Sequence, residues 1–141
     1  LLMGIALAAI AATIFYAYTT FVKKQQLPME DGQLKYFGKV GKDVSVQDAA
    51  KAAELCAINI LSQLSAILCN DLDSIDSCVK LGIFVNAVAD FEDHSTVANG
   101  ASDLIVNILG NAGIHARAAI GVGSLPKNVC VEVEGIFTVK Q

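Results

Sequence analysis

The chain of 141 residues is 54% hydrophobic and 17% charged, which suits one globular domain and excludes an intrinsically disordered chain. Its net charge of −4 and its lack of tryptophan argue against a nucleic-acid protein, because such proteins need Lys and Arg for phosphates and aromatic rings for base stacking. The hydrophobic fraction is high for a small monomer, so we expect part of it to lie in an interface between subunits.

Residues 1–22 carry no charge and are followed by Lys23 and Lys24. A stretch of this length can cross a bilayer, and the two lysines would then mark its cytoplasmic side. Its many alanines and threonines instead suit a buried, strand-forming segment. We expect the strand and keep the membrane anchor as the alternative.

The following segments predict a turn over 27–32, a short strand over 33–38 and then a long helix. Ser45 is placed as the N-cap of this helix, since its hydroxyl can accept from the first free N–H groups and Asp48 favours the positive helix end. Apolar residues then recur at helical spacing over 49–67, which predicts one buried stripe.

Alternating apolar residues over 79–85 predict a strand, and a second helix over 93–109 should end at Gly110. Two strands, 115–123 and 129–139, close the chain, and the turn between them predicts an antiparallel hairpin. This order of elements predicts an α+β domain, with a mixed or antiparallel sheet and two helices on one face. The other face would be apolar and uncovered, which again favours oligomerisation.

Arg117 is the single arginine of the chain and lies in the first strand of that hairpin. A planar guanidinium grips a carboxylate or phosphate through two parallel hydrogen bonds, so Arg117 is a candidate anion-binding residue. The alternative is a structural role, capping a sheet edge or pairing with an acidic side chain. In the predicted hairpin Glu132 lies opposite Gly121 on the face of Arg117, about 13 Å from it along the strand. Glu134 is expected to be a solvated residue.

Asn99 and Gly100 are both poor helix formers within the second helix, where Gly100 suits close packing and Asn99 would present its amide to a ligand. His94 and His115 are not paired with a serine or cysteine in a nucleophile-like arrangement, and each is expected to be structural or a cap. The cysteines lack any C-x-x-C pair, which disfavours a metal site and suits reduced thiols in the cytoplasm. These cysteines are Cys56, Cys69, Cys78 and Cys130.

Several strings of the sequence together resemble the RidA/YjgF family, also called endoribonuclease L-PSP. They are QLP (26–28), VKLGIFV (79–85), VANGASD (97–103), HARAAIGVGSLP (115–126) and VEVE (131–134). The chain most resembles the branch with the QLPMEDG, NGASD and HAR-x-A-x-GV-x-x-LP strings. We expect 1–141 to form a single domain of this family, with 26–139 as the matched core and 1–25 as an atypical apolar segment.

The resemblance implies a chorismate-mutase-like fold, assembled as a homotrimer with clefts between subunits. It implies hydrolysis of reactive enamines and imines, such as 2-iminobutanoate, to 2-keto acids and ammonia without a metal or an organic cofactor. By position, Arg117 matches the arginine that binds the substrate carboxylate, and Glu132 matches the glutamate that positions the attacking water. Asn99 matches a cleft-lining asparagine, and backbone groups of Ala118 and Ala119 would lie beside the ligand.

Three departures from the family pattern bear on activity. Lys24 and Gln25 stand where the family shows Ser-Gly, and the stretch between the Tyr16/Tyr18 region and Gln26 is several residues shorter than usual. Ser102 stands where deaminating members often carry a bulkier residue. They leave open a non-catalytic or regulatory trimer that binds small carboxylates. The acidic charge and the lack of a paired His/Lys site disfavour the endoribonuclease reading of the family name. We expect a cytoplasmic protein with no nucleic-acid partner and, unless 1–22 is an anchor, no membrane partner.

Overall fold

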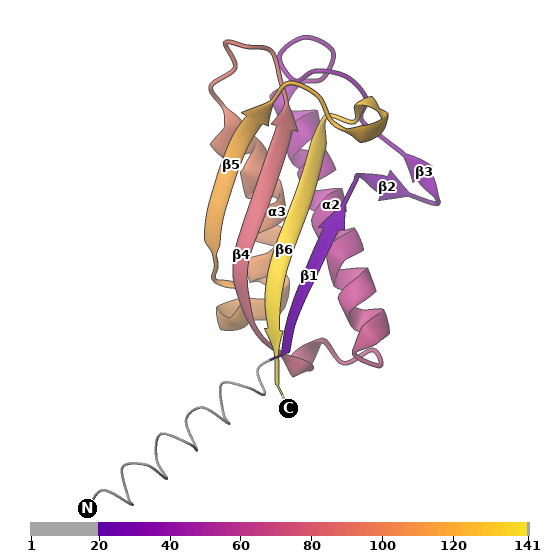
Figure 1. Ribbon diagram of the computed structural model, residues 1–141, viewed down its shortest axis with the longest axis vertical. Coiled ribbons are helices and arrows are strands. Elements are labelled where there is room, and N and C mark those ends of the chain that lie inside the picture. The colour runs from indigo at the N-terminus through magenta and orange to yellow at the C-terminus, as the bar shows by residue number, and fades with distance from the viewer. Residues whose placement is uncertain (1–19, 141) are drawn as a thin grey trace, which may run out of the picture.

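The computed structural model describes residues 20–140, and one mixed four-stranded sheet with two helices behind it makes up most of this part (Figure 1). The sheet has the strand order β1-β6-β4-β5. Its elements are β1 (Thr20–Gln26), β4 (Ile75–Asn86), β5 (Ala116–Val122) and β6 (Val131–Val139), covered by α2 (Val46–Ile67) and α3 (His94–Leu109). This arrangement confirms the predicted α+β class with both helices on one face.

Shorter elements connect these parts. A separate two-stranded hairpin follows β1, and three 3-10 helices stand in the later connections. They are β2 (Met29–Glu30), β3 (Gln33–Leu34), η1 (Leu72–Ser74), η2 (Gly110–Gly113) and η3 (Pro126–Asn128). The strand predicted over 33–38 is therefore shorter than expected, because after Leu34 only Phe37 continues it, through an isolated bridge to Val129.

The prediction for 1–22 falls almost entirely outside the described residues. Its last residues belong to β1, which runs antiparallel to β6 at one edge of the sheet. Within residues 20–140, none of the helices combines the length and the hydropathy that a bilayer crossing requires.

The predicted hairpin of the last two strands is wrong, because β4 lies between them. β5 pairs with β4 in parallel, so β4, α3 and β5 form a crossover unit with the helix packed on the sheet. β6 pairs with β4 and with β1, antiparallel to both. The connection between β5 and β6 is wider than a tight turn, since it holds η3 and the two residues Lys127 and Asn128 at positive φ.

Both helices begin and end as the sequence predicts. The Ser45 hydroxyl accepts a hydrogen bond from the backbone N–H of Asp48 at 3.1 Å, and Gly110 ends α3 with a φ of 58°. Gly100 is explained by packing, because a Cβ there would overlap the carbonyl oxygen of Ala50 on α2. The helix-facing strand positions, together with the inner stripes of both helices, form one continuous core.

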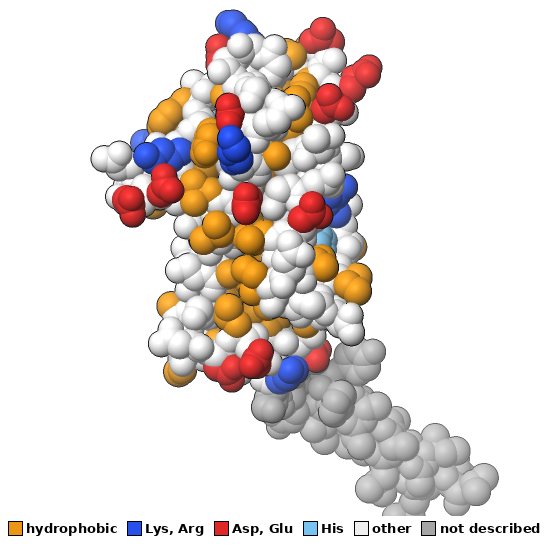
Figure 2. Space-filling model, turned by 180° about the vertical axis from the view of Figure 1, so that it is seen from behind, with side chains coloured by type: hydrophobic (Ala, Val, Ile, Leu, Met, Phe, Trp, Pro, Cys, Tyr) orange, Lys and Arg blue, Asp and Glu red, His pale blue; other side chains and the backbone are white. Residues whose placement is uncertain are grey.

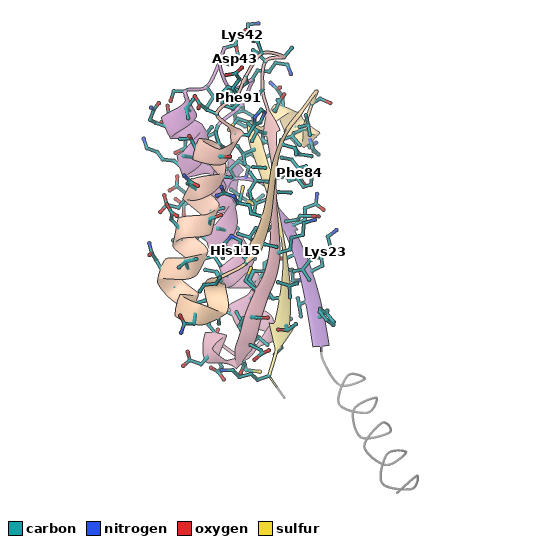
Figure 3. The ribbon with its side chains drawn as sticks, turned by 90° about the vertical axis from the view of Figure 1, so that its left-hand side faces the viewer. Lys23, Lys42, Asp43, Phe84, Phe91 and His115 are labelled. Carbon is teal, nitrogen blue, oxygen red and sulfur yellow. The ribbon has the colours of Figure 1, made fainter. Side chains whose placement is uncertain are left out.

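The two faces of the sheet differ in what covers them. Figure 3 shows Phe84 and Lys23 on the side away from the helices. This open face keeps Phe21 63% and Ile120 50% exposed in the protomer, but it also carries an ion pair between Lys23 and Glu134 at 2.9 Å. The predicted apolar second face is therefore correct only in part.

The outer surface of the two helices has its own pattern. Figure 2 shows a central stretch of hydrophobic and uncharged side chains, with charged groups above and below it. Exposed hydrophobic residues on this side include Ile58 and Ile67 of α2 and Val106 and Ile108 of α3. Ile67 had been expected in the buried stripe, but it is 52% exposed in the last turn of α2, beyond the core.

Candidate functional site

Arg117 projects from β5 toward α3. It lies opposite Leu81 of β4, whose side chain is fully buried on the helix side, and side chains at paired positions share a face. Its Nη1 donates to Oδ1 of Asn99 at 2.7 Å and to Oγ of Ser102 at 3.2 Å. The guanidinium is therefore anchored on the helix at an edge strand, and the residue remains exposed to solvent.

His115 extends this cluster. Its Nε2 lies 3.1 Å from Oγ of Ser102, and its Nδ1 lies 2.6 Å from the carbonyl oxygen of Gly113. The sequence did not indicate this contact with Ser102, whose hydroxyl also accepts a hydrogen bond from Arg117. His115 stands two residues before Arg117, so the alternation of an extended chain turns both side chains toward the same stretch of α3.

All the hydrogen-bond partners of Arg117 are neutral. Among residues 20–140 no acidic side chain lies within salt-bridge distance of the guanidinium. For the described residues this rules out the structural alternative in which Arg117 pairs with an acid. An exposed arginine whose charge is not matched by a neighbour is suited to bind an external anion.

Glu132 lies on the opposite face of the sheet. It stands opposite Phe84 of β4, and its Oε1 accepts a hydrogen bond of 2.7 Å from Nε2 of Gln25 on β1. Its neighbour Glu134, predicted to be solvated, is only 18% exposed because it pairs with Lys23 and lies over Gly82. Both glutamates of β6 are thus held by side chains of β1.

The prediction that Arg117 and Glu132 share a face is also wrong. Their positions on the intervening strand β4 are Leu81 and Phe84, which are three residues apart and therefore point to opposite faces. The error follows from the hairpin, since a pairing of β5 with β6 in the predicted register would have placed the two side chains on the same face. Within one protomer the sheet separates Arg117 from Glu132.

The remaining predicted site residues surround Arg117. Asn99 uses its side-chain oxygen to hold the guanidinium, so it acts on Arg117 rather than presenting that oxygen to a ligand. Ala119 is partly buried against the core, whereas Ala118 is exposed and stands opposite Gly82 on the open face. Both alanines lie on β5, which has no partner strand on its outer side among the described residues.

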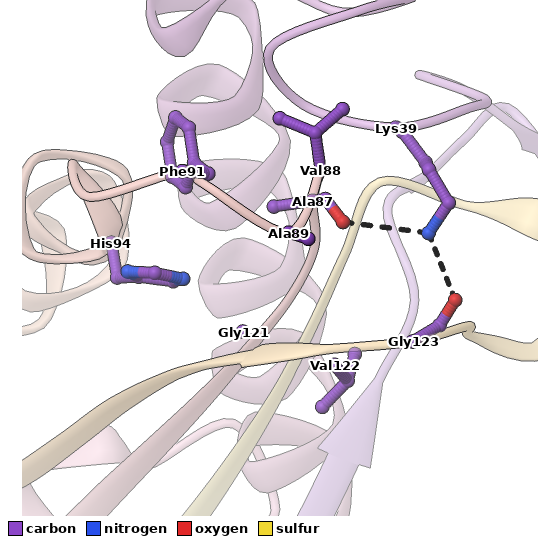
Figure 4. Close-up of a pocket in the computed structure, with 9 residues that line it drawn as sticks. All are labelled: Lys39, Ala87, Val88, Ala89, Phe91, His94, Gly121, Val122 and Gly123. Carbon is purple, nitrogen blue, oxygen red and sulfur yellow. Dashed lines mark hydrogen bonds between the residues drawn. The ribbon is translucent and has the colours of Figure 1, made fainter.

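A cavity of about 660 Å³ lies at the C-terminal end of β5 (Figure 4). Lys39 reaches into it, but its ammonium already donates to Oδ1 of Asn86 and to the carbonyl oxygens of Ala87 and Gly123, at 3.0, 3.4 and 2.9 Å. Three donors with three acceptors leave this lysine little capacity for a ligand. His94 lines the same cavity, and its ring packs edge-on against Phe91 with centroids 5.0 Å apart. The cavity is therefore a weaker candidate than the surroundings of Arg117.

Neither metal nor thiolate chemistry finds support in the described part of the chain. Residues 20–140 contain no group of three or more His, Cys, Asp or Glu side chains placed to hold a metal ion. All four cysteines are free, and burial raises the pKa of Cys78 and of Cys130 to about 12 and raises that of Cys56 as well. Thiols of this kind stay protonated and unreactive near neutral pH.

Comparisons with known proteins agree with this architecture. A family model described as "YjgF/chorismate mutase-like, putative endoribonuclease" matches residues 3–137. Protein TCP17 of Trypanosoma cruzi is 43% identical over 112 residues, which cover 79% of this chain and 69% of that protein.

Two solved structures are similar as well. The protein Atu1372 of Agrobacterium tumefaciens, of unknown function, is 46% identical with a TM-score of 0.83, and the match covers 86% of this chain and 80% of that one. An endoribonuclease candidate from Shewanella oneidensis MR-1 is 28% identical with a TM-score of 0.80, and here the match covers 84% and 79%. The chain therefore belongs to the YjgF/chorismate-mutase-like family, as the resemblance of its sequence strings implied.

Proposed function

We propose that this protein hydrolyses small imines and enamines that bear a carboxylate, releasing 2-keto acids and ammonia, in clefts between the subunits of a cytoplasmic homotrimer. Family membership supports the proposal, and one observation carries it. Arg117, the single arginine of the chain, is exposed on an edge strand and bonded only to neutral acceptors within the described residues. A guanidinium in this state has the charge and the free hydrogens to receive a small carboxylate.

The reaction needs few groups. Water adds to the electrophilic imine carbon and the C–N bond then breaks, so one imine and one water give one 2-keto acid and one ammonia. Arg117 holds the carboxylate and thereby places the imine carbon, which replaces an encounter in solution by a fixed geometry. Glu132 takes a proton from the attacking water, and both protons of that water end on the departing nitrogen as the C=O bond forms.

The positions of these two residues support a site shared between subunits. A ligand on the helix-side edge at Arg117 cannot reach the open face of the same sheet, where Glu132 lies opposite Phe84. Glu132 of a second copy can complete the site if the open face of that copy packs against the β5 edge, where Arg117 lies. The exposed Phe21 and Ile120 on this face favour such packing, because apolar surface is better buried than left in water.

The test is keto-acid release from freshly generated 2-iminobutanoate. We expect the purified protein to accelerate it and Arg117→Ala to reduce the acceleration by about 100-fold or more, as the loss of a charged anchor in a catalytic site does. Lys42→Ala is the matched control, because it also removes one positive charge at an exposed position. Wild-type protein without acceleration, or a fully active Arg117→Ala, contradicts the proposal.

A second function is favoured by one contact. Gln25 stands where the family shows a glycine and already occupies one oxygen of Glu132, which suits a site that binds small carboxylates without turnover. In that case 2-ketobutyrate should bind wild-type protein and not Arg117→Ala, while imine hydrolysis stays at the uncatalysed rate. Sedimentation analysis tests the trimer in either case.

A further inference from the structure

We infer that Ser102 and His115 are positioning residues for Arg117, linked to it by a hydrogen-bond chain that runs in one direction and ends on the backbone. The inference deepens the proposed function, on which it rests for its biological meaning. The chain consists of the guanidinium of Arg117, the hydroxyl of Ser102, the imidazole of His115 and the carbonyl of Gly113.

The direction of the chain follows from its last member. A carbonyl oxygen can only accept, so Nδ1 of His115 must carry the hydrogen in the 2.6 Å bond to Gly113. In the neutral ring Nε2 then has a free lone pair, which accepts the hydroxyl hydrogen of Ser102 across 3.1 Å. With its hydrogen directed at His115, the Ser102 oxygen presents lone pairs to Arg117 at 3.2 Å.

The second observation concerns which nitrogen of Arg117 is used. Nη1 has two hydrogens, and Asn99 and Ser102 receive one each. Nε and Nη2 make no hydrogen bond with any side chain or carbonyl of residues 20–140. Their hydrogens lie along one edge of the guanidinium, and this edge matches the two oxygens of a carboxylate. Asn99 and Ser102 thus use Nη1 alone, and the edge formed by Nε and Nη2 can bind a carboxylate through two hydrogen bonds.

The two positioning residues are largely or partly buried, unlike the exposed Arg117 that they hold. Ser102 is 9% exposed on the inner side of α3, and His115 is half-buried beneath the helix (Figure 3). A long arginine side chain otherwise loses rotamer freedom when it binds an anion. Because the chain fixes the guanidinium beforehand, we expect Ser102 and His115 to act on carboxylate affinity more than on the turnover of bound substrate.

Nuclear magnetic resonance of the wild-type protein tests the hydrogen-bond chain directly. The sequence has one arginine and two histidines, so the side-chain signals of Arg117 are unique and those of His115 are separated by comparison with His94→Phe. We expect neutral His115 as the Nδ1–H tautomer, and Nη hydrogens of Arg117 that exchange slowly with water. Neutral His115 in the Nε2–H form overturns the inference without any variant of the cluster having to fold.

Binding and kinetics of variants supply the second test. Ser102→Ala should weaken 2-ketobutyrate binding and raise KM for the imine by about 10-fold, the size of one lost hydrogen bond, with kcat changed much less. His115→Leu should do the same, whereas His115→Gln should restore much of the affinity because its amide oxygen can accept from Ser102. Ser95→Ala on the exposed side of α3 is the matched control. Unchanged binding in both Ser102→Ala and His115→Leu overturns the inference.

The two proposals fail in different ways. If 2-ketobutyrate binding depends on Ser102 and His115 but the protein does not hydrolyse imines, the proposed turnover is contradicted and the positioning role remains. Protein that hydrolyses imines equally well with and without Ser102 sinks the positioning role alone.

Discussion

Arg117 and Glu132 lie on opposite faces of one sheet, and they are held by different kinds of contact. The partners of Arg117 come from α3, 15 and 18 residues earlier in the chain, so this cluster forms within one β4-α3-β5 unit. Glu132 depends on Gln25, which is 107 residues away and reaches it only because β1 packs beside β6. One half of the candidate site is therefore a local structure, and the other half depends on the closure of the whole sheet.

The largest expected effect tests whether these two halves act in different subunits. Arg117→Ala and Glu132→Ala should each lower imine hydrolysis by about 100-fold or more, since each removes a group from the proposed catalytic site. When the two inactive proteins are unfolded, mixed and refolded together, some clefts combine an intact Arg117 with an intact Glu132.

For a site shared between neighbouring subunits, random mixing in equal amounts restores about one quarter of wild-type activity, because each cleft needs the right variant on both sides. A site confined to one protomer gives no recovery at all. The control is refolded wild-type protein, and initial rates of keto-acid release provide the measurement.

The two faces should also differ in stability. Phe137 of β6 is fully buried against the helices, so Phe137→Ala should lower the free energy of unfolding by about 3–5 kcal/mol. Phe84 is half-buried on the open face, and Phe84→Ala should cost less folding stability while weakening assembly. Urea unfolding and sedimentation of both variants separate these effects. Equal losses of stability with intact assembly would show that the open face is not an interface.

The thiols buried in the core on the helix side should make the protein less stable at alkaline pH. Burial raises the pKa of Cys78 and Cys130 from the ordinary value of 9.0 to about 12. Above pH 9 the unfolded chain releases these protons and the folded chain keeps them, so the free energy of unfolding falls as pH rises. The slope approaches about 1.4 kcal/mol per pH unit for each thiol.

Urea unfolding at pH 8 and pH 10 measures this slope. The Cys78→Ala/Cys130→Ala double variant should lose less stability between these pH values than wild-type protein, although its stability at pH 8 is lower. Cys69→Ala, which changes an exposed thiol, should retain the wild-type slope. Identical slopes in the wild type and the double variant would contradict the burial of these thiols.

The sequence predicted those features that depend on short-range pattern. Helix caps at Ser45 and Gly110, and the buried stripes between them, follow from hydrogen-bonding capacity and helical spacing. Arg117 as a candidate anion-binding residue in a strand was also predictable, because a single guanidinium stands out in a chain that otherwise uses lysine.

Strand order was not predictable from the same signals. The residues of β5 and β6 alternate equally well whether the strands pair with each other or with β4, and only the parallel crossover through α3 decides. The contacts Gln25–Glu132 and Ser102–His115 were not predicted either, because each joins residues of two different elements. The alternation that aligns His115 with Arg117 could have indicated the second contact, but no local pattern points to the first.

The smallest expected effect isolates the non-local half of the candidate site. Gln25→Ala removes the hydrogen bond to Oε1 of Glu132, and Lys23→Ala removes the neighbouring ion pair with Glu134. If Glu132 activates the water, Gln25→Ala should lower kcat by about 10-fold, because it removes a hydrogen bond that orients the base. KM should stay close to wild type, because no contact with the substrate carboxylate is lost. Lys23→Ala is the matched control, because Lys23 is an exposed residue of the same strand whose ammonium pairs with Glu134 and not with Glu132, so both kinetic constants should stay near wild type. A shift of KM in Gln25→Ala would place this glutamine in substrate binding, and equal effects of the two variants would reduce Gln25 to a structural role in β1.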